Sequence, residues 1–223
     1  MKHYILILLL CTITRTILLA SPPAEADRLL AASQAALKAK DAKAAVELAE
    51  QAVAADPARA DLQAHLGSAY SVRIGEVNFM HQAIISHKML AAFERAVELD
   101  PDHIGGRIGL SRYYTHAPAI AGGSRAKAEA EAQRLKQRHP FLGTLEHGLI
   151  AEHFGDFAKA REAFAEAAKL QPDNPHVHER LGAVAEKAGD PATARRHYEQ
   201  ALRLEPSRNE AEQALKRLAE AAE

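Results

Sequence analysis

The sequence predicts an all-α protein built as a stack of about five helix–turn–helix repeats. Two segments carry this prediction, GDFAKAREAFAEAAKLQP at 155–172 and GDPATARRHYEQALRLEP at 189–206. They begin 34 residues apart and place Gly-Asp, Ala, an aromatic residue, Ala and Pro at the same offsets. Composition agrees with the helical prediction. Alanine is frequent, aromatic residues make up 5%, and tryptophan is absent, whereas a β-sandwich would be rich in β-branched and aromatic residues.

Proline marks the ends of the repeats, because it lacks a backbone N–H and cannot continue the interior of a helix. The repeat-closing prolines are Pro57, Pro101, Pro140, Pro172 and Pro206, with spacings of 44, 39, 32 and 34 residues. These spacings predict repeats at 27–59, 60–101, 102–140, 141–174 and 175–206. The two long spacings exceed 34 by ten and by five (44 − 34 and 39 − 34). We therefore expect insertions between the helices of the second repeat, around GEVNFMHQAI, and of the third, in THAPAIAGGS.

Each repeat keeps part of the same signature. The first is degenerate, with Ala49 where an aromatic residue is expected. The later ones carry a small residue in the first helix and an aromatic or alanine pattern in the second; the matches are Leu66, Gly67, Tyr70, Phe93, Leu110, Ser111, Tyr114, Gly148, Phe164, Leu181, Gly182 and Tyr198. Residues 207–223 form a one-sided amphipathic pattern, which predicts a capping helix over the last apolar face.

This pattern resembles the tetratricopeptide repeat family over nearly the whole chain after residue 26. The resemblance implies a right-handed superhelical solenoid with a concave surface, built mostly by the first helix of each pair, that binds a protein or peptide. Carried onto this chain, the family's groove positions are Ile108, Arg112, His116, Leu145, Leu149, Glu152, His153, His176 and Glu179. Taken singly, each of these residues also suits an ordinary exposed helix surface.

The two insertions form a second candidate site. Long loops on a rigid scaffold often carry function, and adjacent inserted turns should lie on one edge of a solenoid. The residues concerned are Phe79, Met80, Pro118, Gly122 and Gly123. The alternative is that the two insertions pack on one another as a local cap.

No catalytic residue, metal site or cofactor is predicted. The chain has twelve histidines, but none stands four residues from another with the glutamate of a zinc-protease helix. Surface or groove positions explain them. The AGGS stretch before Arg125 could hold a phosphate at a helix N-terminus, or Ser124 could simply cap that helix while the two glycines bend the turn. The second interpretation is favoured, because the ending of a phosphate-binding loop is missing.

Residues 1–26 predict an export signal. Lys2 precedes the apolar run Ile5–Leu10, and apolar character resumes at 17–20. Ala24 and Ala26 form a small-x-small pattern, which predicts cleavage after Ala26. Arg15 interrupts the run, which is short of the roughly 20 apolar residues of a membrane span. The expected location is therefore periplasmic, with an uncleaved membrane anchor as the alternative. The only cysteine, Cys11, lies in this segment.

Together these observations predict an exported, non-enzymatic scaffold for a protein or peptide partner. The alternative is a ligand-binding accessory component of a periplasmic transport system, with a small-molecule ligand. The formal net charge of −1 gives no field that would attract nucleic acid. Self-association stays open, because solenoid ends and alanine-rich faces can pair.

Overall fold

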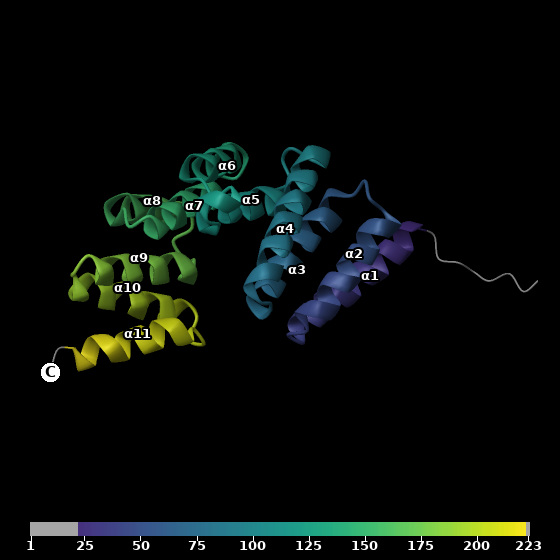
Figure 1. Ribbon diagram of the computed structural model, residues 1–223. Helices are drawn as coiled ribbons and strands as arrows, with labels where there is room; N and C mark the ends of the chain where they lie inside the picture. The colour runs from purple at the N-terminus through teal and green to yellow at the C-terminus, as the bar shows by residue number, and fades with distance from the viewer. Residues whose placement is uncertain (1–21, 222–223) are drawn as a thin grey trace, which may run out of the picture.

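The computed structural model describes residues 22–221, which form eleven α-helices and two short 3₁₀ turns, without a strand. The helices pack in chain order as antiparallel pairs, from α1 in purple to α11 in yellow (Figure 1). The first helices of the pairs are α1 (Pro22–Lys38), α3 (Ala60–Arg73), α5 (Ile104–His116), α7 (Pro140–His153) and α9 (Pro175–Lys187). The second helices are α2 (Ala42–Ala55), α4 (Phe79–Leu99), α6 (Arg125–Arg138), α8 (Phe157–Leu170) and α10 (Pro191–Leu204). The predicted all-α solenoid is confirmed.

The remaining elements are α11 (Asn209–Glu220), η1 (Ile74–Glu76) and η2 (Ala119–Ala121). Helix α11 covers the last pair with a face of Ala211, Ala214 and Leu218, which pack against Tyr198 and its neighbours. Among residues 22–221, no helix combines the length and apolar character needed to cross a bilayer.

The Gly-Asp turns are explained by backbone geometry. Gly155 ends α7 in the left-handed region at φ 75°, and the Asp156 N–H donates back to the Ala151 carbonyl at 2.8 Å. The Asp156 side chain then caps α8 by accepting from the Lys159 N–H. The turn after α1 has the same form, but Lys40 occupies the left-handed position at φ 60°. Glycine is favoured there, because its missing Cβ removes the steric cost.

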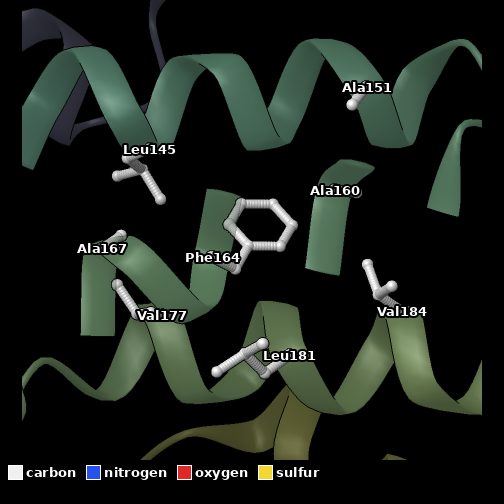
Figure 2. Close-up of a cluster of buried hydrophobic side chains, with 8 residues drawn as sticks. All are labelled: Leu145, Ala151, Ala160, Phe164, Ala167, Val177, Leu181 and Val184. Atoms are coloured by element: carbon white, nitrogen blue, oxygen red, sulfur yellow. The ribbon is translucent and has the colours of Figure 1, made fainter. Parts of the chain in front are cut away.

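In three of the five pairs, α3–α4, α7–α8 and α9–α10, an aromatic ring of the second helix packs on a glycine of the first. Phe164 of α8 is fully buried among side chains of α7 and α9 (Figure 2). A Cβ on Gly148 would lie 2.4 Å from the Phe164 ring. Phe93 of α4 lies between two glycines in the same way, with Cβ distances of 2.6 Å for Gly67 and 2.3 Å for Gly109. The small residue in the first helix is therefore required for the ring of the second helix to pack.

The prediction of a long turn between the helices of the second repeat is wrong. Most of the inserted residues extend α4, which is 21 residues long and begins at Phe79, and only Val77 and Asn78 separate it from η1. The Asn78 side chain caps α4 by accepting from the His81 N–H at 3.1 Å. Because no glycine or proline follows until the helix ends, the segment continues as helix. Phe79 and Met80 thus lie in its first turn, 84% and 79% exposed.

The predicted export signal falls mainly on residues 1–21, which lie outside the described residues, as does Cys11. The remainder of the predicted signal belongs to α1, since that helix begins at Pro22. Ala26 is fully buried there, packed with Leu29, Ala52 and Leu62.

Candidate functional site: a groove along the first helices

Three cavities follow one another along the first helices. The apolar cavity, about 580 Å³, lies between α3, α4 and α5; the basic cavity, also about 580 Å³, lies between α5, α7 and α9; and the C-terminal cavity, about 430 Å³, lies between α9, α10 and α11. Arg112 and His116 line both the apolar and the basic cavity, and His176 and Arg180 line both the basic and the C-terminal one. The three cavities therefore form one continuous surface, called the groove below.

The apolar cavity is walled mainly by hydrocarbon. Its apolar lining includes Ile74, Met89, Phe93, Ile108, Tyr113 and Pro118. The Tyr113 hydroxyl donates to the Ala121 carbonyl at 2.7 Å and lies 3.1 Å from the Ser86 hydroxyl. These contacts tie α4 to the turn after α5, so the second inserted segment is fixed against α4 beside the cavity.

The second inserted turn is folded by its two glycines. Gly122 has φ 90°, and a Cβ on Gly123 would lie 1.7 Å from the Ala117 carbonyl oxygen. Ser124 caps α6 by accepting from the Lys127 N–H at 3.4 Å. The glycines and Ser124 therefore have the turn-and-cap geometry that the sequence favours over a phosphate loop.

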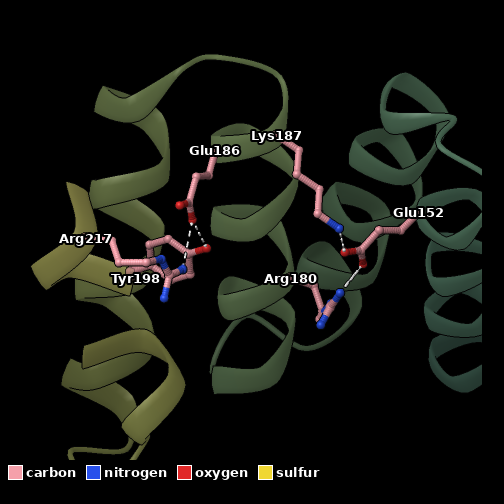
Figure 3. Close-up of polar contacts among 6 residues, drawn as sticks. All are labelled: Glu152, Arg180, Glu186, Lys187, Tyr198 and Arg217. Atoms are coloured by element: carbon pink, nitrogen blue, oxygen red, sulfur yellow. Dashed lines mark hydrogen bonds and ion pairs between the residues drawn. The ribbon is translucent and has the colours of Figure 1, made fainter. Parts of the chain in front are cut away.

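The basic cavity has buried carboxylates beneath partly exposed cations. Glu152 accepts from Arg180 Nε and from Lys187 Nζ, each at 3.0 Å (Figure 3). Glu146 accepts from Arg112 Nη2 at 3.0 Å. The Glu146 and Glu152 side chains are only 3% and 4% exposed, whereas those of Arg112, Arg180 and Lys187 are 57%, 28% and 50% exposed. The groove therefore presents positive charge.

The two carboxylates are shifted in opposite directions. Burial raises the pKa of Glu146 above its usual value, although Arg112 and Ser111 act against that rise. Burial also acts to raise the pKa of Glu152, but the hydrogen bonds and charges of Arg180 and Lys187 outweigh it and lower that pKa. Glu152 thus has two cationic partners where Glu146 has one, and its charged form is the better stabilised.

Histidines line the groove between these charges. The His116 and His153 rings meet edge to face with centroids 4.6 Å apart. Burial, together with His153 and Arg112, lowers the pKa of His116; burial and the nearby arginines lower that of His176. Both rings are therefore neutral near neutral pH. Across residues 22–221, no group of three or more potential ligands is placed to hold a metal ion.

The groove brings together most of the residues that the sequence points to. Ile108, Arg112 and His116 line the apolar cavity; Leu149, Glu152, His153 and His176 line the basic one; Glu179 lines the C-terminal one. Leu145 does not line it, because its side chain is buried in the core between α7, α8 and α9 (Figure 2). Glu152 and Glu179 are not free groove charges either, since each is buried in ion pairs, Glu179 with Arg208.

Sequence reasoning missed Glu146, Arg180 and Lys187. A signal for the two cations exists, because His176, Arg180 and Lys187 are spaced by four and seven residues, which puts them on one helical face. Phe79 and Met80 do not line any of the three cavities, whereas Pro118 lines the apolar one.

Comparisons with known proteins agree with this architecture. The tetratricopeptide repeat family model matches residues 119–175 and 145–209. TTC0263, a thermophilic TPR protein from Thermus thermophilus, superposes with a TM-score of 0.70 at 20% identity, over 88% of this chain and 98% of its own. PilW, described as a widely conserved type IV pilus biogenesis factor, gives 0.66 at 15% identity, over 88% and 86%.

MamA from Desulfovibrio magneticus RS-1, from its residue 41 onward, gives a TM-score of 0.56 at 18% identity, over 83% of this chain and 97% of its own. These structures share the fold. No curated protein sequence matches the chain.

Proposed function

Because residues 119–209 match the tetratricopeptide repeat model and the rest of the described chain continues the same fold, we propose that this protein is an exported scaffold that binds a protein or peptide partner in its groove. Repeats of this family are typically non-catalytic scaffolds. The observation that carries the proposal is the continuity of the groove, since shared residues join three cavities along the stack. An elongated partner can contact such a surface over several repeats at once.

Photocrosslinking tests this proposal at single positions. A photoreactive amino acid replaces His116, which is exposed at the junction of two cavities, in the full-length protein made by its own cells. The matched control replaces Arg161, which is exposed on the second helix α8. We expect a reproducible protein adduct from position 116 and none from position 161. A protein adduct from position 161 alone would contradict the groove as the binding surface.

Export is the second part of the proposal, and the signal-like residues 1–26 support it. A cut after Ala26 would remove the first turn of α1 and with it a fully buried side chain. A cut near Ala20 would keep α1 whole. We therefore expect the mass of the exported protein to correspond to a start upstream of Ala26. Recovery of the unprocessed chain in the membrane fraction would favour the anchor instead.

One observation favours a second function, ligand binding for a periplasmic transport system. The apolar cavity, about 580 Å³, falls in the size range of small-molecule sites. Native mass spectrometry of the freshly purified protein tests this alternative. An adduct of fixed mass that disappears when Ile108 is replaced by Arg would support it.

A further inference from the structure

We propose that the groove selects an acidic peptide segment with one large apolar residue, which enters the apolar cavity while its carboxylates lie over the basic cavity. This inference rests on the proposed function and names the chemistry of the partner. It depends on two different surfaces that are joined at Arg112 and His116.

The apolar cavity suits a hydrocarbon side chain, because its hydroxyl groups already donate within the protein. The Ser68 hydroxyl donates to the Ala64 carbonyl at 3.0 Å, and the Ser71 hydroxyl to the Ser68 carbonyl at 2.7 Å. The Tyr113 hydroxyl donates to Ala121. A peptide side chain in this cavity therefore contacts mainly the apolar surface of Ile74, Met89, Ile108 and Pro118. Removing that surface from water favours binding.

The basic cavity suits carboxylates, because it offers three cations above two buried glutamates. Arg112 and Arg180 each use Nε and Nη2 to hold the glutamate beneath them. Within residues 22–221, neither Nη1 makes a hydrogen bond, so these guanidinium N–H groups remain for a ligand. Charge-assisted bonds to a carboxylate are the strong hydrogen bonds of such a surface. A basic segment would meet these cations before it could reach Glu146 or Glu152.

The distance between the helices determines how many residues separate the apolar anchor of the peptide from its acidic residues. Neighbouring packed helices lie about 8–10 Å apart, so α5 and α9 are separated by roughly two such steps. An extended chain advances about 3.3 Å per residue. Acidic residues two to six positions from the apolar anchor would therefore lie between Arg112 and Lys187.

Selection from a random peptide library displayed on phage tests this chemistry with the full-length protein. We expect enriched peptides to carry one large apolar residue with two or more Asp or Glu within about six positions on one side, as the helix spacing requires. Enrichment on the parent protein but not on the Ile108→Arg variant would assign the peptides to the groove. Circular dichroism verifies that this variant is folded.

Paired charge variants then test the acidic half. The variant R112Q/K187Q removes two half-exposed cations and leaves Arg180 on Glu152; the control R161Q/K169Q removes two exposed cations from α8. For a selected peptide, we expect R112Q/K187Q to lower the affinity at least about tenfold, because charge-assisted hydrogen bonds are lost. Raising NaCl from roughly 50 to 500 mM should weaken binding to the parent far more than to this variant.

The outcomes separate the inference from the proposed function. Groove-dependent peptides without acidic residues, or equal losses in the two charge variants, would overturn the acidic segment and leave the scaffold standing. Peptides that bind the parent and the Ile108→Arg variant equally would overturn the apolar anchor. No enrichment on the parent protein at all would overturn both.

Discussion

Two glutamates on α7 are six residues apart, and each lies beneath a cation of the basic cavity, yet their energetics differ. Glu152 is shared by Arg180 and Lys187, and its pKa is lowered. Glu146 has the half-exposed Arg112 as its cation, and its pKa is raised. A lowered pKa means that folding favours the charged form, and a raised pKa means that folding disfavours it.

These opposite shifts predict different responses to removal of charge. At pH 7, Glu152→Gln should reduce the free energy of unfolding by about 1–3 kcal/mol. This stability is present above the unfolded pKa near 4.5 and is lost as pH falls through the lower folded pKa. Glu146→Gln should be neutral or stabilising at pH 7. The raised pKa of Glu146 contributes stability below about pH 4.5, and this contribution is lost as pH rises through the folded pKa, so the charged form present at pH 7 is disfavoured by folding. Urea unfolding at pH 7 and near pH 4 checks both, and equal losses at pH 7 would contradict the assignment.

The left-handed residue at the end of α1 gives a second prediction. Lys40 occupies at φ 60° the place that Gly155 occupies at φ 75°. Lys40→Gly should stabilise the protein by about 1 kcal/mol, because a side chain in this region is strained. The reciprocal change, Gly155→Lys, should destabilise it by a similar amount. Thermal and urea midpoints of the two variants provide the measurement, and a stabilising Gly155→Lys would be the contrary result.

At the scale of the element, repeated turn chemistry made the helix pairs predictable. In each Gly-Asp sequence the glycine takes the left-handed conformation and the aspartate caps the next helix. This occurs at Gly155 with Asp156 and at Gly189 with Asp190. The extension of α4 was not predictable from repeat length alone, because ten extra residues fit a loop as well as three turns of helix. The helical extension follows from local features, namely the Asn78 cap and the uninterrupted helical segment after it.

Side-chain direction was the other limit of sequence reasoning. The groove positions transferred from repeat numbering include Arg112, His116 and His153, which line one cavity in the structure. The same numbering failed for Leu145, whose side chain enters the core. It also left out Arg180 and Glu146, because ion pairs between helices depend on how neighbouring pairs stack.

The capping helix α11 provides the element-scale prediction. Truncation after Ser207 would expose the surfaces covered by Ala211, Ala214 and Leu218 and remove the Arg208–Glu179 ion pair. We expect a loss of about 3 kcal/mol or more in the free energy of unfolding. Deletion of residues 222–223 alone, which leaves α11 intact, serves as the control. Equal stability of the two truncated proteins in urea would show that α11 is not needed as a cap.

At the scale of the whole molecule, each helix pair packs mainly on its neighbours, so stability is close to a sum of local terms. Leu62 lies in the core cluster near α1 and Leu218 in the cluster under α11. The destabilisations of Leu62→Ala and Leu218→Ala should therefore add to within about 0.5 kcal/mol.

Hydrogen exchange provides a further measurement of this independence. In the Leu218→Ala variant, faster exchange should be confined to the C-terminal helices, because local opening need not spread along a stack. Faster exchange in α1 and α2 as well, or a strong interaction energy in the double variant, would indicate a single cooperative unit instead.

The apolar cavity also has an optical consequence. The protein contains no tryptophan, and the aromatic rings that line this cavity are those of Phe93, Tyr113 and His116. A peptide with tryptophan as its anchor would therefore bring the only indole into the complex. Light absorbed by indole but not by tyrosine would excite the guest alone. Its emission should move to shorter wavelength as the ring leaves water for the surface of Ile108 and Met89, so the spectrum of unlabelled material would report directly whether the cavity is filled.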